Sequence, residues 1–353
     1  MLLQALEVLQ SSLQTLQSHP AGLLINGLAL ALLAVTALQA VAAVIGFVYA
    51  YFLRPGRNLK FYGPWAVVTG STDGIGKAYC EELAKKGLNL VLISRTESKL
   101  KEVAAELSGK FGVEARYVAA DLCKAGPDTF AKIGAALEGL EVGLLVNNAG
   151  MSYDHSEYLD EMDAGVVPDM VTINALVPTM LCHMVVKGMR ERGRGAIVNV
   201  GSGVSTVMPQ APLLAVYGAT KAYVDSLSRS LDAEYSPMGV RVQNQAPMYV
   251  ATKMSKIKRA RLDAPMPATW AAAAVKQIGR ETSFTPYWFH GLQSLFVKLA
   301  PTSLINTMVM NMQQDLRARY HRRLARQQAE AAAAALGDEP PPSESKRELR
   351  RRK

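Results

Sequence analysis

The sequence predicts an α/β fold, a doubly wound parallel β-sheet with an N-terminal transmembrane helix and a helical C-terminal extension. Short runs rich in Val, Leu and Ile alternate with longer stretches of helical periodicity through the middle of the chain. A glycine-rich turn joins the first of these runs to the first helical stretch, and residues 21–53 contain no charged side chain. Strands that are apolar throughout are typical of a parallel sheet covered by helices on both faces.

The first 53 residues predict a membrane anchor. Residues 21–53 form an uncharged stretch of 33 residues, and about 20 apolar residues cross the hydrocarbon core of a bilayer. A helix of a globular protein averages only about 11 or 12 residues, and a signal peptide needs a basic segment that residues 1–20 lack. Leucines at three- and four-residue intervals predict that residues 1–20 form an amphipathic segment on the membrane surface. The basic Arg54, Arg57 and Lys60 place the rest of the chain in the cytosol.

The order of the expected elements predicts one domain over residues 62–299. Strands are expected at 66–69, 90–94, 115–119, 143–146, 196–200 and 240–243, and the last of these ends the set. Helices are expected at 74–86, 98–111, 127–138, 168–191 and 213–235. Right-handed crossovers between parallel strands then give the dinucleotide-binding architecture of the Rossmann fold. Residues 300–336 are expected to form a C-terminal helical extension and residues 337–353 a disordered basic tail.

Composition excludes several other classes of protein. The 353 residues carry a formal charge of +9, but residues 317–353 alone hold 11 Lys and Arg against 5 Asp and Glu. The basic excess is therefore local, which argues against a nucleic-acid-binding domain. The three cysteines, Cys80, Cys123 and Cys182, have no CxxC spacing, so we expect neither a disulfide framework nor a metal site.

The turn after the first expected strand predicts a cofactor-binding site. Glycines allow a tight turn and let the backbone approach a pyrophosphate, whose charge is stabilised at the N-terminus of the following helix. A purely structural turn is the alternative, but this turn follows a strand and opens a helix, as a binding turn requires. The residues expected to bind the cofactor are Gly70, Ser71, Thr72, Asp73, Gly74, Ile75 and Gly76.

Arg95, at the end of the second expected strand, predicts which cofactor binds. An acidic residue here would bind the ribose 2′-hydroxyl of NAD, whereas a guanidinium suits a 2′-phosphate. We therefore expect NADPH. The alternative, an arginine on a solvated loop, stays open at this point.

Four motifs together resemble the short-chain dehydrogenase/reductase family over residues 62–255. They are the glycine turn with Thr69 before it, Asn147-Asn148-Ala149-Gly150, Ser202, and Tyr217-Gly-Ala-Thr-Lys221. Within that family the sequence resembles the membrane-bound very-long-chain 3-oxoacyl-CoA reductases and their 17β-hydroxysteroid dehydrogenase relatives. This narrower resemblance depends on residues 198–203, 215–225, 249–254 and 285–288.

The resemblance implies roles for the candidate catalytic residues. Tyr217 is the general acid, Ser202 steadies the carbonyl oxygen of the substrate, and Asn174 holds a water that completes a proton relay. Ser202 precedes Tyr217 by 15 residues, which is longer than the usual separation in the family, so Ser205 is the alternative to Ser202.

Lys221 is expected to lower the pKa of Tyr217. It follows Tyr217 by four residues, so on a helix both side chains project from one face. A cation at about 4 Å is worth on the order of 4 kcal/mol at an effective dielectric of 20, which corresponds to roughly three pKa units. By resemblance, Lys221 also holds the nicotinamide ribose, Asn148 supports the cofactor through its backbone, and Asp121 faces the adenine. A plain helix cap is the alternative for Asp121.

The resemblance implies NADPH-dependent reduction of a long-chain 3-oxoacyl-CoA to the 3-hydroxyacyl-CoA in very-long-chain fatty acid elongation. It also implies a single-pass protein of the endoplasmic reticulum membrane with a cytosolic catalytic domain. Other fatty acid elongation enzymes and, by analogy, a second copy of the chain are the expected protein partners; nucleic acid is not. Two alternatives stay open: a reductase of a steroid or another lipophilic ketone, and a membrane scaffold without catalysis, against which the intact Ser202, Tyr217 and Lys221 argue.

Two segments after the last expected strand have more than one interpretation. Five cations, Lys253, Lys256, Lys258, Arg259 and Arg261, occur within nine residues beside the expected substrate entrance. They suit the phosphates of coenzyme A, or equally a membrane-facing surface attracted to anionic lipid. The apolar residues of 287–299 suit an acyl tunnel, the membrane interface or the core, so whether residues 284–310 enter the membrane stays open.

Overall fold

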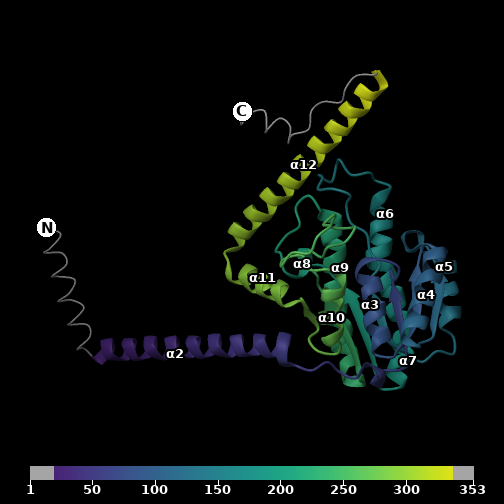
Figure 1. Ribbon diagram of the computed structural model, residues 1–353. Helices are drawn as coiled ribbons and strands as arrows, with labels where there is room; N and C mark the ends of the chain where they lie inside the picture. The colour runs from purple at the N-terminus through teal and green to yellow at the C-terminus, as the bar shows by residue number, and fades with distance from the viewer. Residues whose placement is uncertain (1–19, 337–353) are drawn as a thin grey trace. The chain divides into compact units, whose positions relative to one another are not determined.

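The computed structural model of the chain describes residues 20–336 (Figure 1). Within this range the chain divides into two units between Pro55 and Gly56. The expected amphipathic segment up to residue 19 and the expected basic tail of residues 337–353 lie outside the described residues.

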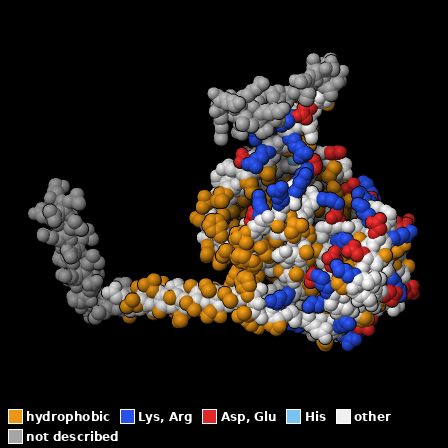
Figure 2. Space-filling view, viewed as in Figure 1, with side chains coloured by type: hydrophobic (Ala, Val, Ile, Leu, Met, Phe, Trp, Pro, Cys, Tyr) orange, Lys and Arg blue, Asp and Glu red, His pale blue; other side chains and the backbone are white. Residues whose placement is uncertain are grey.

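The first unit is one long apolar helix. Helix α2 spans Pro20–Val48 and runs into a π-helical turn, Tyr49–Leu53. Most of its described side chains are exposed within this unit, and Figure 2 shows hydrophobic side chains along α2. Residues Asn26–Leu53 are long and apolar enough to cross a bilayer, with a mean hydropathy of 2.5. The other stretch of this kind within residues 20–336, Val166–Glu191, is half buried in the core of the second unit. Helix α2 is therefore consistent with a membrane anchor.

The second unit is built on a seven-stranded parallel sheet, which confirms the expected fold class. The strand order is β3-β2-β1-β4-β5-β6-β7, and every neighbouring pair is parallel. The chain order reverses between β1 and β4, so the loops at their carboxyl ends leave in opposite directions and open a crevice. The strands are β1 Trp65–Thr69, β2 Asn89–Ser94, β3 Ala115–Ala119, β4 Val142–Asn147, β5 Gly195–Val200, β6 Val240–Gln245 and β7 Ser283–Phe284.

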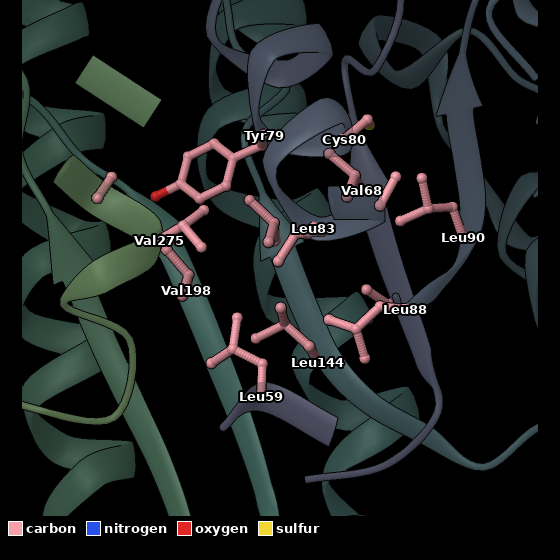
Figure 3. Packing of buried hydrophobic residues seen from close by; sticks show 14 of the residues in the cluster. Leu59, Val68, Tyr79, Cys80, Leu83, Leu88, Leu90, Leu144, Val198 and Val275 are labelled. Atoms are coloured by element: carbon pink, nitrogen blue, oxygen red, sulfur yellow. The ribbon is translucent and has the colours of Figure 1, made fainter. Parts of the chain in front are cut away.

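Helices cover both faces of the sheet, and each face has its own hydrophobic core. On one face α3, α4 and α10 pack against strand residues such as Val68 and Leu144, and Figure 3 shows this core from close by. On the other face α5, α7 and α9 pack against Val67 and Leu145. Successive strand residues therefore point into different cores, which explains strands that are apolar throughout. These helices are α3 Gly74–Lys85, α4 Glu97–Phe111, α5 Pro127–Leu137, α7 Val177–Glu191, α9 Ala215–Tyr235 and α10 Pro267–Lys276.

Two expectations about the elements are wrong. Strand β6 does not end the set, because β7 pairs with its last residues, Asn244 and Gln245. These polar residues are buried but hydrogen-bonded, so they extend the strand. The helix expected at 168–191 is interrupted: α6, Val166–Val171, is joined to α7 by a π-helical turn, Thr172–Leu176. Helix α10 and the short α8, Gly203–Thr206, have no counterpart among the expected helices.

Between β7 and residue 336 there are two further helices, and the second is fixed to the domain. The Gln313 side chain accepts a hydrogen bond of 2.6 Å from the Ser156 hydroxyl, and both residues are buried. One turn later Arg317 forms an ion pair of 2.5 Å with Glu161. The C-terminal extension therefore packs against the loop after β4. These helices are α11 Trp288–Leu299 and α12 Thr302–Leu336.

Candidate active site

A cavity of about 570 Å³ lies at the carboxyl ends of β1, β2 and β4, where the chain order of the sheet reverses. This is the usual position of a nucleotide in an open α/β sheet. The lining comes from the glycine turn after β1, the start of α4, the loops after β3, β4 and β6, and helix α9. The predicted residues that line it are Gly70, Thr72, Asp73, Gly74, Ile75, Arg95, Asp121, Asn148, Tyr217 and Lys221.

The glycine turn has the backbone shape that a pyrophosphate-binding loop requires. Gly70 and Gly74 have φ values of +64° and +53°, in the left-handed region that favours glycine. Asp73 caps α3, because its carboxylate accepts a hydrogen bond of 2.8 Å from the Gly74 amide. Lys253 forms an ion pair with Asp73 and lowers the pKa of its carboxyl group. The turn therefore offers amide donors at the start of a helix, beside a carboxylate whose charge is compensated.

Gly76 and Ser71 support the turn and do not line the cavity. A Cβ on Gly76 would lie 2.1 Å from the Gly70 carbonyl oxygen, so glycine lets α3 pack against the turn. The Ser71 side chain is buried, and its hydroxyl donates a hydrogen bond of 3.4 Å to the Ile93 carbonyl. Gly76 therefore serves helix packing and Ser71 the sheet, and contact of their backbone with the cofactor stays a prediction.

Asn148 both lines the cavity and holds the turn in place. Its side-chain nitrogen donates hydrogen bonds to the carbonyl oxygens of Thr69 and Gly70, at 3.0 and 3.3 Å. Its backbone amide donates to the Thr69 hydroxyl at 3.0 Å. The strand ends β1 and β4 are therefore tied together at the floor of the cavity.

Two cations stand at one end of the cavity. Arg95 is exposed after β2, Lys99 lies in the first turn of α4, and both line the cavity. Neither forms an ion pair or a side-chain hydrogen bond with another residue of the described range 20–336. Asp121 lines the same cavity, and its carboxylate accepts a hydrogen bond of 3.1 Å from the Cys123 amide. Asp121 therefore does both things expected of it, facing the cavity and capping a helical turn.

Tyr217 and Lys221 line the cavity on the far side of the reversal in chain order between β1 and β4. They are one helical turn apart on α9. Tyr217 is half-buried, and its side chain is hydrogen-bonded with that of Ser202, the N-cap residue of α8. The Ser205 hydroxyl instead donates to the Ser202 carbonyl at 3.3 Å. Of the two serines, the structure brings Ser202 to Tyr217. Lys221 is buried, and its ammonium donates a hydrogen bond of 2.9 Å to the Val200 carbonyl.

Asn174 lies behind this group in the π-helical turn and does not line the cavity. Its side-chain oxygen accepts a hydrogen bond from the Met151 amide, and its nitrogen donates to the Met151 carbonyl and the Thr220 hydroxyl, at 3.0, 2.9 and 3.1 Å. The oxygen and the nitrogen of the Asn174 side chain are thus both already engaged by neighbouring residues.

Residues 64–263 match the family model described as short chain dehydrogenase. The chain belongs to the short-chain dehydrogenase family. A human protein named very-long-chain 3-oxoacyl-CoA reductase is 46% identical over 260 residues, which cover 73% of this chain and 82% of that relative. An Arabidopsis thaliana protein named as very-long-chain 3-oxoacyl-CoA reductase-like is 42% identical over 261 residues, covering 72% and 83%. The resemblance drawn from the motifs is confirmed.

Solved structures of similar proteins share the fold of this short-chain dehydrogenase. A short-chain dehydrogenase from Sphingobium yanoikuyae in complex with NADPH has a TM-score of 0.57 and 30% identity, covering 67% of this chain and 96% of that one. A 7β-hydroxysteroid dehydrogenase structure has a TM-score of 0.64 and 25% identity, covering 72% and 99%. The family and these structures support a nicotinamide cofactor.

The cavity of this short-chain dehydrogenase fits such a cofactor. The left-handed glycines Gly70 and Gly74 bring backbone amides to the position of a pyrophosphate at the start of α3. Arg95 and Lys99 have no carboxylate partner among residues 20–336, and they suit a further phosphate at the end beside β2. The opposite end holds the hydroxyl and ammonium groups that carbonyl chemistry needs.

Burial dominates the pKa of the two central side chains of this short-chain dehydrogenase. Burial raises the pKa of Tyr217, and the hydrogen bond with Ser202 opposes it. Burial lowers the pKa of Lys221 to about 8. The expected lowering of the Tyr217 pKa by Lys221 is therefore not found, because desolvation of the phenol outweighs the favourable contacts. A raised pKa keeps the phenol protonated, which suits an acid.

Sequence reasoning misses two features of this short-chain dehydrogenase's site besides Lys99. His290 is buried, and its Nδ1 accepts a hydrogen bond of 3.3 Å from the Met248 amide, 42 residues away along the chain. Burial lowers its pKa to about 4, so the ring is neutral and holds the loop after β6. The Lys253–Asp73 ion pair fastens the same loop to the cofactor turn. These contacts join residues that are far apart in the sequence, so no local pattern could have predicted them.

Proposed function

We propose that this protein catalyses the NADPH-dependent reduction of a long-chain 3-oxoacyl-CoA to the 3-hydroxyacyl-CoA. The relatives that are 42–46% identical over most of the chain carry the name very-long-chain 3-oxoacyl-CoA reductase. The observation that carries the proposal is that Tyr217 and Lys221, with Ser202 beside Tyr217, stand at one end of a cavity whose other end holds Arg95 and Lys99.

The carbonyl end of the site supplies the proton of the reduction. Reduced nicotinamide supplies a hydride to the carbonyl carbon of the substrate. The Tyr217 hydroxyl donates its proton to the carbonyl oxygen as negative charge develops there, because that oxygen becomes more basic than the phenolate. The Ser202 hydroxyl donates a hydrogen bond to the same oxygen and stabilises the developing charge.

Lys221 and Asn174 would help to return a proton to Tyr217 after it has donated its own. The Lys221 ammonium attracts the phenolate left after proton transfer, and it is held by its bond to the Val200 carbonyl. A Cβ on Gly150 would lie 2.9 Å from the Asn174 side-chain oxygen and 3.5 Å from the Lys221 nitrogen. Glycine therefore lets both residues approach, and a water held at Asn174 would connect Lys221 to solvent.

The cofactor preference follows from the phosphate end of the cavity. Arg95 and Lys99 form no ion pair within residues 20–336, and two such cations would bind the 2′-phosphate of NADPH with charge-assisted hydrogen bonds. NADH lacks that phosphate, so the same cations would gain nothing from it. We therefore assign NADPH as the cofactor.

The placement of the protein follows from its first unit. Residues 21–53 would anchor the chain in the endoplasmic reticulum membrane, with the reductase domain of residues 62–299 and the helical extension of residues 300–336 in the cytosol. There the protein would act beside the other enzymes of fatty acid elongation. Protease treatment of intact microsomes tests this topology, because a cytosolic domain is digested and a lumenal one is protected.

The proposed function is tested with the purified full chain in detergent. A long-chain 3-oxoacyl-CoA is mixed with NADPH, and both NADPH loss and the 3-hydroxyacyl-CoA product are measured. Turnover that depends on the acyl-CoA supports the function, and no product at any chain length contradicts it. A panel of steroid ketones tests the alternative, which the 7β-hydroxysteroid dehydrogenase structure favours through its fold. Higher kcat/KM on a steroid than on any 3-oxoacyl-CoA would select that alternative.

A further inference from the structure

A second pocket adjoins the cofactor cavity. It measures about 750 Å³, and it shares Asp73, Gly74, Thr252 and Lys253 with the lining of the first. Its walls come from α3, the segment after β6, the start of α10, and α12. None of the three residues proposed to act on the carbonyl lines it. The reduction itself therefore gives this pocket no role.

Positive charge converges on this pocket from three separate elements. The lining contains two carboxylates and five cations, one cation from α3, three from the segment after β6 and one from α12. Figure 2 shows Lys and Arg side chains gathered where α12 crosses the domain. The cations of the pocket are Lys77, Lys253, Lys256, Lys258 and Arg323.

Lys258 and Arg323 are the two cations available to a ligand. The other three already form ion pairs, Lys77 with Glu106, Lys253 with Asp73 and Lys256 with Asp154. Lys258 and Arg323 are exposed, and neither forms an ion pair with any residue between 20 and 336. Of the five cations noted in the sequence after β6, Arg261 lies outside this pocket and pairs with Asp263 at 2.7 Å.

Arg323 is held over the pocket because α12 is fixed just before it. The Tyr320 ring stacks on His155, with centroids 3.7 Å apart and 12° between the ring planes. The Lys256 ammonium lies 5.9 Å from the centre of the same Tyr320 ring. Arg323 follows Tyr320 by three residues, so it projects from the same face of the helix. The C-terminal helix thus delivers a cation to a concavity of the reductase domain.

We propose that this pocket binds the phosphorylated nucleotide end of the acyl-CoA substrate, with Lys258 and Arg323 on its phosphates. The proposal rests on the proposed function, because the thioester end must reach Tyr217 while the nucleotide stays outside the cofactor cavity. Thr252 and Lys253 form the partition between the two spaces. Met266 and Pro267 give the pocket an apolar wall that suits an adenine ring.

The surroundings of the cations favour a nucleotide over a membrane surface. Anionic lipid headgroups carry the same phosphate chemistry, but this pocket adjoins the cofactor cavity and has an apolar wall beside its cations. Here the cations line a pocket with apolar walls, as expected for a single molecule that carries several phosphates beside a ring.

The test compares substrates with and without the nucleotide, using the full chain in neutral detergent. One 3-oxoacyl chain is presented as its coenzyme A thioester and as its pantetheine thioester, which lacks the nucleotide. In the double variant Lys258→Gln/Arg323→Gln we expect KM for the coenzyme A thioester to rise about tenfold or more. KM for the pantetheine thioester, KM for NADPH and kcat stay unchanged. Equal effects on both thioesters, or none on either, would overturn the proposal.

Matched controls and a binding measurement separate this proposal from the proposed function. Lys86→Gln and Arg322→Gln remove exposed cations outside the pocket and should leave the ratio of the two KM values unchanged. Adenosine 3′,5′-bisphosphate should bind the wild type and lose about tenfold in affinity in the double variant, whether or not the chain turns over an acyl-CoA. Equal affinity in both proteins overturns the proposal. A KM effect that appears only in bilayers containing phosphatidylserine assigns the cations to lipid headgroups and also overturns it.

Discussion

The side-chain nitrogen of Lys221 lies 6.0 Å from the centre of the Tyr217 ring, one turn along α9. The same nitrogen donates a hydrogen bond to the Val200 carbonyl at the end of β5, 2.9 Å away. A long, flexible side chain is thus held at its charged end by the backbone of a strand. Its cation is placed before any substrate arrives, so no rearrangement of charge is needed during proton transfer.

Removing the phenol should nearly abolish the reduction. Tyr217→Phe keeps the ring and its packing but removes the proton donor, so kcat should fall by about 100- to 10,000-fold. NADPH binding, measured by fluorescence, should stay within about threefold of the wild type, since the phosphate end of the cavity is untouched. A variant that keeps wild-type turnover would end the assignment of Tyr217 as the acid.

The two neighbouring serines should differ in their effect on rate. Ser202 is hydrogen-bonded with Tyr217, whereas the Ser205 hydroxyl donates to the Ser202 carbonyl. We expect Ser202→Ala to lower kcat by about 100-fold, as the loss of a donor to developing charge does. Ser205→Ala, the matched control, should keep kcat nearly unchanged. The reverse order in steady-state kinetics would place the catalytic hydroxyl on Ser205.

The apolar strands and the motif residues of the site could be predicted because each has a recognisable pattern in a few consecutive residues. The expected strand at 115–119 has the bounds of β3, and the glycine turn lies where the first strand meets the first helix. The seventh strand, Ser283–Phe284, could not be predicted, since a two-residue strand has no periodicity to read. Its position depends on its pairing with Asn244 and Gln245. Because these two residues are polar, the sequence pattern does not show that β6 continues through them.

The charges around the site could not be predicted for a related reason. Lys253 follows β6 and was expected at the substrate entrance, but it pairs with Asp73, 180 residues earlier, at the cofactor turn. The direction in which the Tyr217 pKa shifts could not be predicted from the sequence either. A neighbouring cation can be inferred from spacing, whereas the desolvation that raises the pKa of the phenol depends on everything packed around the ring.

The rate of reduction should fall on the basic side of neutral pH. Burial lowers the pKa of Lys221 to about 8, so the ammonium is charged below that pH and loses its proton above it. Because the charge attracts the phenolate left by Tyr217, kcat should decline as the pH rises through about 8. The pH profile of kcat measures this. In Lys221→Arg the guanidinium stays charged, so its lower kcat should show no decline near pH 8, and an unchanged decline would assign it to another group.

Removing the cation after β2 should change which cofactor is used. Arg95→Gln removes a charge-assisted hydrogen bond worth about 1.5–3 kcal/mol, so KM for NADPH should rise by about 10- to 100-fold while KM for NADH stays unchanged. Arg116→Gln is a matched control, since Arg116 is outside the cavity and pairs with Glu114 at 2.7 Å. Equal changes with both cofactors would show that Arg95 does not contact a 2′-phosphate.

A partly buried ion pair between α9 and β6 should contribute more to stability than an exposed one. The Asp232 carboxylate accepts bonds from Arg241 at 2.9 and 3.1 Å and from the Val242 amide at 2.9 Å. Asp232→Ala leaves the partly exposed Arg241 without its carboxylate and the Val242 amide without its acceptor, so it should lower the free energy of unfolding by about 1–3 kcal/mol. Glu97→Ala breaks the exposed pair with Lys101 and removes an acidic residue from the first turn of α4, and it should lower the free energy of unfolding much less. Thermal unfolding in detergent compares the two variants, and similar midpoints would contradict the assignment.

Burial raises the pKa of Asp232, but its hydrogen bonds with Arg241, Thr282 and Val242 outweigh burial and lower it below the ordinary 3.8. The unfolded chain therefore binds more protons than the folded chain as the pH falls below about 4. This part of the stability is complete above that pH and is lost as the pH falls further. The difference in unfolding midpoint between wild type and Asp232→Asn should thus shrink on acidification below pH 4, and a difference that grows would reverse the sign.

The close approach of α3 to the glycine turn should make position 76 intolerant of any side chain. A Cβ there would lie 2.1 Å from the Gly70 carbonyl oxygen and 2.4 Å from the Asn148 side-chain nitrogen, and a backbone atom cannot give way as a flexible side chain can. Gly76→Ala should therefore displace the turn and weaken NADPH binding by at least about tenfold, with a lower unfolding midpoint.

Gly109→Ala is the matched control, because nothing lies within 4 Å of a Cβ at that position of α4. It should raise stability by about 0.5–1 kcal/mol and leave NADPH affinity unchanged. Gly76→Ala with wild-type affinity would mean that helix packing at this glycine does not shape the cofactor turn.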